Sequence, residues 1–230
     1  VNLNGRVSSF AIENEFIHLA GDFSSIGGEP SNLFATVNTA SQSIIRVSES
    51  SALTGTAFDL EINGDTAFIV GNLWDVGNTG ISYLAGFDWT TGDLLEWRPQ
   101  VNASANLLRI QGNTLFVGGR FWEVDEQPRT SLAGYSLISL ELNDDQILVE
   151  GSFPSGTVLE TFDGELLFGT NKTIMQSEIR YGFAALDLEG QVFDLAIPFI
   201  EANKAVFDIE LVGNRVYAAG DFSGKFINDS

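Results

Sequence analysis

Cysteine is absent from the 230-residue sequence, and histidine occurs once, at His18. The lack of cysteine excludes disulfides, thiolate metal sites and cysteine nucleophiles. With a single histidine as well, zinc, copper and non-haem iron sites have no usual ligand set. A Ser-His-Asp triad would have to use His18, which lies in the apolar run "FIHLAG", where a structural or solvent-facing role is expected. These absences favour a protein that is not an enzyme.

Basic residues are also scarce, with 11 Lys and Arg against 31 Asp and Glu and a net charge of −20. Phosphate binding needs clustered Lys and Arg, so we expect no nucleic-acid partner. An anionic membrane surface is disfavoured for the same reason. The acidic residues are spread along the chain, which is typical of a solvated surface and also suits an extracellular, saline setting.

Long apolar runs are missing. No stretch reaches the roughly 18 residues that span a bilayer, and the start "VNLNGRVSSF" has no basic and apolar signal regions. We therefore expect no membrane insertion, and a signal sequence, if one exists, to be removed or to lie outside these residues. No stretch of twelve or more residues has a helical period either.

What the sequence does contain is a repeat of about 50 residues. Apolar runs end at anchor positions separated by 50, 48, 51 and 50 residues, namely Gly21, Gly71, Gly119, Thr170 and Gly220. A second motif places an alanine fourteen residues after each of the first four anchors, at Ala35, Ala85, Ala133 and Ala184. Two motifs that keep one offset through four copies indicate a true internal repeat.

Each copy contains short β-like runs bounded by turn residues. The first copy has "VSSFAI", "FIHLAG", "LFATVN" and "SIIRV", and the second has "AFDLEI", "TAFIVG", "YLAGFD" and "LLEW". Four strands in about 50 residues are typical of a β-propeller blade. The predicted fold is an all-β propeller with blades at about 7–56, 57–104, 105–155 and 156–204 and a partial blade at 205–230. Because a propeller closes its ring to protect strand edges, we expect an incomplete ring from a longer chain.

The second and third copies resemble the delta-sixty type β-propeller repeats of large secreted and surface bacterial proteins. The resemblance rests on Gly118, Gly119, Phe121, the "Gln-Pro-Arg" loop 127–129, Leu132 and Ala133, together with Thr91, Gly92, Trp97 and Pro99. It is partial in the first copy and weak in the fourth. Related repeats occur in the ectodomains of fungal cortical cell-polarity markers. The resemblance implies an extracellular or cell-surface location and brings no catalytic residues.

The connections that follow the anchors are the candidate binding loops, since loops on a rigid scaffold commonly carry function. Apolar residues that recur two and five residues after the anchor predict core positions, such as Phe23, Phe121, Ile26 and Val124. By contrast, Trp74 and Trp122 occur in two copies only, with Asp75, Glu123 and Arg129 beside them. These five residues predict an aromatic and charged patch for a glycan or protein partner. The alternative is that each Trp packs between neighbouring blades.

Carboxylates leave two further options open. Asp59, Asp88, Asp187 and Asp208 occupy strand ends, which indicates turn chemistry, although an acid–base pair of the glycosidase kind would also use such residues. Calcium is the one metal whose ligands are present, at "DWTTGD" (88–93) and "LNDDQ" (142–146). The first of these segments is fully explained as a Thr-Gly turn, and we expect no cofactor.

The sequence thus predicts a non-enzymatic extracellular or cell-surface propeller that acts as a binding, adhesion or structural module of a larger protein. Its partners would be a protein or glycan at the inter-strand loops and other domains of the same chain. The alternative is a secreted carbohydrate-active enzyme with carboxylates at the mouth of the ring. Clustered carboxylates with raised pKa around a central pocket would favour that alternative.

Overall fold

The computed structural model describes residues 2–46, 54–74, 81–144, 149–150, 158–162, 165–175, 178–186, 192–193, 206–212 and 215–221. Within these ranges the chain is all-β, with antiparallel sheets and no helix. No helix in the described ranges could therefore cross a membrane.

The sheets form one after another along the chain. The first sheet has the order β1 (Arg6–Glu13), β2 (Phe16–Asp22), β5 (Phe34–Asn38) and β6 (Ile44–Arg46). The second sheet contains β7 (Thr54–Asn63), β8 (Thr66–Trp74) and β9 (Ile81–Asp88), and the third contains β10 (Ala105–Gln111), β11 (Thr114–Gly119) and β14 (Leu132–Ser136). Each strand pairs with the next strand of its sheet, so the four runs predicted in the first copy are confirmed.

The remaining strands form a fourth and a fifth sheet and two small hairpins. The fourth sheet contains β15 (Val149–Glu150), β16 (Val158–Phe162), β17 (Glu165–Met175), β18 (Glu178–Leu186) and β19 (Val192–Phe193), and the fifth contains β20 (Val206–Val212) and β21 (Arg215–Gly220). The hairpins are β3 (Ser25–Ile26) with β4 (Glu29–Pro30), and β12 (Glu123–Val124) with β13 (Gln127–Pro128). Each hairpin occupies the connection that follows an anchor glycine.

The predicted fourth strand of the second copy, "LLEW", is reduced to a single bridge between Phe87 and Leu94. Beyond this bridge the chain leaves the sheet, and Trp97 packs between the second and third sheets. Its ring lies 5.5 Å from the ring of Phe68 and 5.0 Å from that of Tyr135, both in edge-to-face geometry. Aromatic pairs in this geometry stabilise the contact between the two sheets.

The anchor glycines lie opposite a β-bulge in the first strand of their sheet. Register shifts fall between Val7 and Ser9, Ala57 and Asp59, Ala105 and Leu107, and Val206 and Asp208. A Cβ atom on Gly21, Gly71 or Gly119 would overlap a backbone carbonyl oxygen of the bulged strand and lie 2.9 Å from the next Cα atom. Glycine recurs at the anchor because the bulge brings two backbones too close for any side chain.

The repeated alanines pair with the residue two positions before the anchor. Ala35 lies opposite Leu19, Ala85 opposite Ile69, Ala133 opposite Val117 and Ala184 opposite Phe168. The two motifs therefore mark the second and third strands of one sheet. Their constant fourteen-residue offset reflects a connection of constant length.

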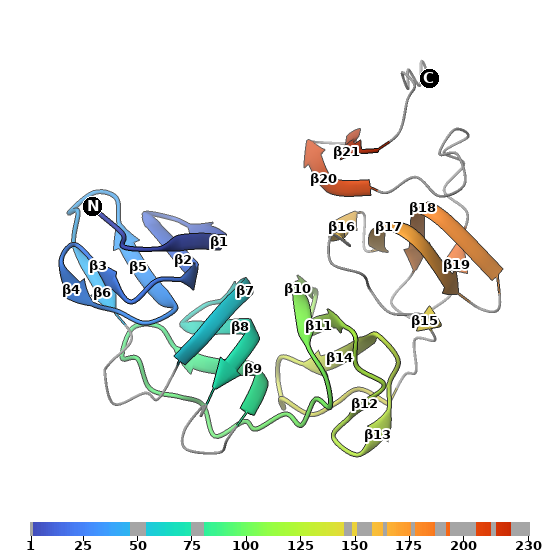
Figure 1. Cartoon of the computed structure of the whole chain (residues 1–230), viewed down its shortest axis with the longest axis horizontal. Coiled ribbons are helices and arrows are strands. Elements are labelled where there is room, and N and C mark those ends of the chain that lie inside the picture. The colour runs from blue at the N-terminus through green and yellow to red at the C-terminus, as the bar shows by residue number, and fades with distance from the viewer. Residues whose placement is uncertain are drawn as a thin grey trace.

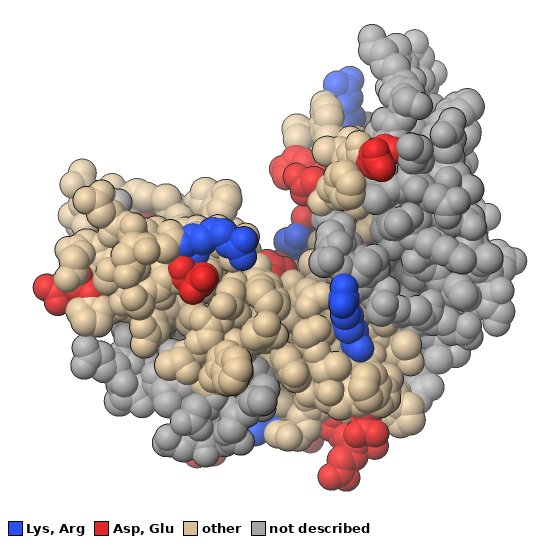
Figure 2. Space-filling view, viewed as in Figure 1, with Lys and Arg blue, Asp and Glu red and all other residues tan. Residues whose placement is uncertain are grey.

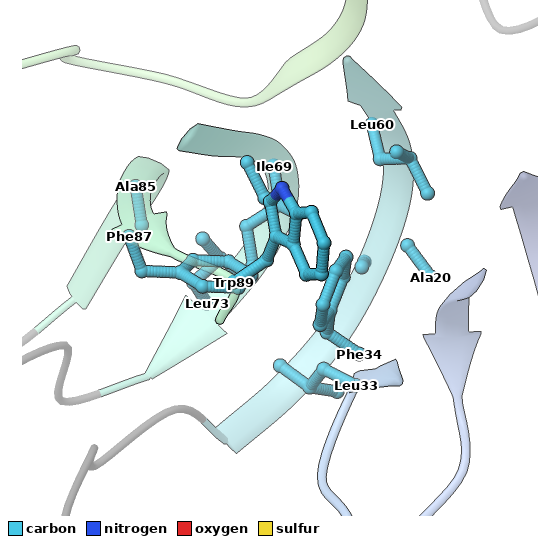
Figure 3. Packing of buried hydrophobic residues seen from close by; sticks show 11 residues of the cluster. Ala20, Leu33, Phe34, Leu60, Ile69, Leu73, Ala85, Phe87 and Trp89 are labelled. Atoms are coloured by element: carbon cyan, nitrogen blue, oxygen red, sulfur yellow. The ribbon is translucent and has the colours of Figure 1, made fainter. Parts of the chain in front are cut away.

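Buried side chains join the first three sheets to one another. Between the first and second sheets, Ala20, Leu33 and Phe34 meet Leu60, Ile69 and Phe87, with Trp89 beside them (Figure 3). The rings of Phe34 and Phe87 lie 4.7 Å apart in edge-to-face geometry. The other face of the second sheet, with Phe68 and Leu84, packs on the third. Phe23, Phe121, Ile26 and Val124 are buried as predicted.

His18 is part of the first of these interfaces. Its side chain is fully buried, lies 4.8 Å from the Trp89 ring and shares a 2.8 Å hydrogen bond between Nδ1 and the Thr36 hydroxyl. The pair His18 and Thr36 occupies the register position of Phe68 and Gly86 in the second sheet and of Phe116 and Gly134 in the third. Where the first residue of the pair is the larger Phe, the second is glycine. The pair as a whole therefore fills a similar volume in each sheet.

The sheets are arranged along an open arc, with β1, β7, β10, β16 and β20 on its inner side (Figure 1). Consecutive members of this series contact one another. The arc therefore brings one strand from each sheet together around a common centre.

Candidate functional site

A charged cluster occupies the inner strands of the arc. Glu61, Arg109, Glu160 and Glu210 hold the same register position in four successive sheets, opposite the residue three positions before each anchor. Figure 2 shows acidic and basic side chains close together along this hollow side of the molecule.

Arg109 connects three sheets. Its Nη1 atom donates to Glu61 Oε1 at 2.9 Å, its Nη2 atom donates to Glu160 Oε1, and its Nε atom donates to the carbonyl oxygen of Leu159 at 3.0 Å. The Glu61 and Glu160 side chains are 17% and 22% exposed. All three groups of the guanidinium are therefore used to hold neighbouring sheets together.

Asp59 makes a second connection between sheets. It lies at the bulge of β7, where its carboxylate accepts hydrogen bonds from the Ser9 hydroxyl at 2.7 Å and the Leu108 amide at 2.8 Å. The prediction that Asp59 sits in a turn at a strand end is wrong, because the bulge turns its side chain across to β1 and β10. Asp208 also lies within a strand, at the corresponding bulge of β20, so that prediction is wrong as well. Asp187 lies outside the described residues.

Burial raises the pKa of three of these carboxyl groups. Desolvation raises the pKa of Glu61 to about 7, opposed by the positive charge of Arg109. Desolvation also raises the pKa of Glu160 and Asp59, and Arg109 again opposes it. A carboxyl group with a pKa near 7 can give or take a proton at neutral pH. Here, however, protonation of Glu61 would remove the negative charge that pairs with Arg109.

The sequence contains a signal for this cluster that motif reading missed. Glu61, Arg109, Glu160 and Glu210 are separated by 48, 51 and 50 residues, which are the spacings of the anchors. A charged residue that recurs at the repeat length marks one position in successive sheets. Which opposite charges such a residue meets depends on which sheets become neighbours.

The five predicted patch residues fall into three groups. Trp74, at the end of β8, is 56% exposed, and Trp122, just before β12, is 62% exposed, so neither Trp packs between sheets. Glu123 is exposed on β12. Arg129 is only 4% exposed, and Asp75 lies outside the described residues.

Arg129 is part of the loop framework. Its guanidinium donates to the carbonyl oxygens of Pro128 and Asn143, at 3.0 and 2.8 Å, and to the side chain of Gln127 at 3.0 Å. These bonds tie the β12–β13 hairpin to the segment that follows β14. The exposed part of the predicted patch therefore consists of the tryptophans and Glu123, without the arginine.

The β3–β4 and β12–β13 hairpins have the same backbone scaffold. The side chain of Asn4 accepts hydrogen bonds from the amides of Ser24 and Ser25, both at 2.9 Å. Asn102 accepts the corresponding bonds from Trp122 and Glu123 at 3.1 and 3.3 Å. One framework thus presents two serines in the first sheet and a Trp-Glu pair in the third.

The two hairpins turn through different residues. Gly27 and Gly28 form the first turn with φ values of +63° and +87°, whereas Asp125 and Glu126 form the second with +48° and +62°. Glycine adopts these values freely, but other L-residues do so at a cost. The side chain of Asp125 compensates in part, because it accepts hydrogen bonds from the Tyr135 hydroxyl at 2.8 Å and the Gln100 amide at 2.7 Å.

The calcium candidate "DWTTGD" forms a turn. The Asp88 carboxylate accepts hydrogen bonds from the Thr90 hydroxyl at 2.7 Å and from the Thr90 and Thr91 amides at 2.8 and 3.1 Å. These bonds lower the pKa of Asp88. Among the described residues no group of three or more His, Asp or Glu side chains could hold a metal ion. Part of "LNDDQ" lies outside that range.

An open pocket of about 430 Å³ lies away from the inner cluster, near the starts of β1 and β7. Its walls include Arg6, Asp22, Asn32 and Thr54. The carboxylates with raised pKa do not line it. The inner cluster and this pocket are therefore separate features.

No family model matches the sequence. No curated protein matches it either. Solved structures with a similar fold include the following two. The computationally designed Ika8 protein is 11% identical with a TM-score of 0.51, covering 94% of this chain and 68% of its own. A member of the DUF4221 family from Bacteroides vulgatus is 11% identical with a TM-score of 0.50, covering 99% of this chain and 74% of its own. Such low identity indicates a shared fold alone.

Proposed function

We propose that the chain is part of a β-propeller in an extracellular or cell-surface protein, where it acts as a non-enzymatic binding or adhesion module. The sheets succeed one another around an arc with one inner strand each, as propeller blades do (Figure 1). The likeness to the two solved structures is compatible with this arrangement. The extracellular location rests on the resemblance to delta-sixty type repeats and on the acidic composition.

The observation that carries the proposal is the exposure of Trp74 and Trp122. Both follow their anchor glycine by three residues, so they occupy the same position in adjacent repeats, and both are more than half exposed. Exposed aromatic groups on a rigid scaffold are typical of recognition surfaces, because their flat faces stack on sugar rings and on protein side chains. The partner is accordingly a glycan or a protein.

The state of the inner carboxylates supports a non-enzymatic role. Glu61 and Glu160 both pair with the guanidinium of Arg109, and the carboxylate of Asp59 accepts hydrogen bonds from Ser9 and Leu108. Groups that are fully committed to holding sheets together are poorly placed to exchange protons with a substrate. Their recurrence at the repeat spacing also suits a structural role.

The proposal is tested by binding measurements on the 230-residue chain. A panel of soluble oligosaccharides and a panel of immobilised peptides are screened, and each hit is measured again with Trp74→Ala and Trp122→Ala. We expect each substitution to weaken binding by about tenfold or more, as for an aromatic residue at the centre of an interface. Ile138→Ala is the matched control, since Ile138 is 82% exposed but lies outside the anchor loops. Binding that survives both Trp substitutions contradicts the proposal.

The competing function is a secreted carbohydrate-active enzyme, which the raised pKa values of Glu61 and Glu160 favour. Such an enzyme needs one carboxyl group as acid and another as base or nucleophile. We expect no hydrolysis of a nitrophenyl glycoside panel above the uncatalysed rate. Turnover that disappears in Glu61→Gln or Glu160→Gln would replace our proposal with the enzyme.

A further inference from the structure

The inner strand of each of the five sheets carries an apolar residue at one position, which follows the bulge in the first, second, third and fifth sheets. In the second to fifth sheets this residue is Leu60, Leu108, Leu159 and Ile209, and in the first sheet it is Phe10. Each of them pairs with the residue two positions before its anchor. They therefore hold one position of the repeat.

Burial separates the first sheet from the others at this position. Leu60, Leu108, Leu159 and Ile209 are at most 3% exposed, whereas Phe10 is 63% exposed. Two residues further along, Ile12 is 66% exposed, while Ile62 and Ile110 in the corresponding places are partly buried against the core clusters. The first sheet thus exposes to solvent the apolar side chains at the two repeat positions that later sheets bury.

The preceding sheet accounts for the difference. Leu60 is covered by Ala20 and Phe34 of the first sheet, and Leu108 by Phe68 and Leu84 of the second. In both cases the covering side chains come from the strands β2 and β5 or from their equivalents β8 and β9. The apolar face of each inner strand is therefore matched to the outer strands of the sheet before it.

The structure assigns to the face formed by Phe10 and Ile12 one occupant, a further sheet of the same repeat carried by the same polypeptide. The inference rests on the propeller part of the proposed function and deepens it. That sheet would cover Phe10 with an aromatic or branched apolar side chain, as Phe34 and Phe68 cover Leu60 and Leu108. The residue between Phe10 and Ile12, Ala11, points to the opposite face of β1 and packs against the core between the first and second sheets.

The surrounding surface fits this occupant. Behind Phe10, the face continues over Leu19 and Val37, which are partly buried against Phe23 and Ala35. The exposed side chains of Phe10 and Ile12 are thus part of a continuous apolar face of the first sheet. Apolar surface of this kind on a soluble protein marks an interface.

The test compares the 230-residue chain with the intact polypeptide purified from its natural source, each carrying Phe10→Ser with Ile12→Ser. We expect the thermal midpoint of the 230-residue chain to change by less than about 2 °C, because both side chains already face water. In the intact polypeptide the same pair of substitutions should lower the midpoint of this domain by roughly 5 °C or more. Ile138→Ser, also at an exposed isoleucine, should change neither.

Two results would overturn the inference. One is a midpoint that falls in neither protein, which means that nothing covers the face. The other is a concentration-dependent midpoint in the 230-residue chain that the double substitution abolishes, which means that a second copy covers it. Ligand binding through Trp122, measured on the same samples, reports separately on the proposed function.

Discussion

A Cβ atom placed on Gly71 would lie 2.9 Å from the Cα atom of Ala57, its partner across β7 and β8. It would also overlap the carbonyl oxygen of Thr56. Both obstacles are backbone atoms, so no change of side-chain conformation can make room. The bulge that creates this contact recurs at Gly21 and Gly119.

We therefore expect Gly71→Ala to lower the free energy of unfolding by about 3 kcal/mol, through forced separation of two paired strands. Urea denaturation followed by fluorescence measures the change. Gly64→Asn serves as the control, because a Cβ on Gly64 meets nothing within 4 Å and asparagine tolerates its φ of +57°. Equal effects of the two substitutions would show that the bulge is not the cause.

Burial of His18 makes the free energy of unfolding depend on pH in the acidic range. Burial lowers the pKa of His18 from 6.5 to about 4, and within the described residues its Nε2 atom has no hydrogen-bond partner. Between pH 6.5 and 4 the unfolded chain binds a proton that the folded chain does not. The contribution of His18 to stability is therefore complete above pH 6.5 and falls by roughly 3 kcal/mol as the pH drops to 4.

The repeat itself suggests the variant that removes this dependence. His18→Phe together with Thr36→Gly reproduces the pair found at Phe68 and Gly86, so it should fold and should lose most of the decrease in stability below pH 6.5. Denaturation midpoints at pH 7 and pH 4.5 for both proteins give the comparison. An unchanged pH dependence in the double variant would mean that other groups cause it.

Arg109 should contribute most to the free energy of unfolding at high pH. Arg109→Met leaves Glu61 and Glu160 together without their cation, and we expect it to cost about 2 kcal/mol at pH 8. The cost should shrink at pH 5, because the pKa of Glu61 is raised to about 7, so Glu61 then takes up a proton, and the raised pKa of Glu160 acts in the same direction. Unfolding is measured at the two pH values. Arg120→Met, at an exposed arginine, should have little effect at either, and an Arg109 effect that grows at pH 5 would reject the explanation.

The turn of the β12–β13 hairpin stores backbone strain. Glu126 is exposed at the tip with a φ of +62°, where its counterpart in the first sheet is Gly28. We expect Glu126→Gly to raise the free energy of unfolding by about 0.5 kcal/mol, because relief of the left-handed conformation outweighs the greater freedom of glycine in the unfolded chain. The reverse change in the first hairpin, Gly28→Glu, should be destabilising. Opposite signs in the two hairpins are the result to look for in thermal denaturation.

The amino-acid pattern predicts the all-β character, the strands of the first copy and the recurring core positions, and the lack of cysteine excludes disulfides and thiolate sites. These features are local or periodic. The anchor, which is glycine in all copies but the fourth, and the alanine fourteen residues after each of the first four anchors mark a pair of neighbouring strands. Apolar residues at a constant offset from that pair then have to point into the same layer.

Which side chains of different sheets meet could not be predicted, because it depends on how the sheets pack against one another. The sequence predicts a turn residue at Asp59, because a bulge leaves no trace in composition, and it places Arg129 in an exposed patch, because Arg129 stands in the same connection as Trp122 and Glu123. The exposure of Trp122, the ion pairs of Arg109 across three sheets and the contrast between Phe10 and Leu60 all depend on contacts between residues about 50 positions apart. The repeat fixes that spacing, but the curvature of the arc decides which groups it brings within reach.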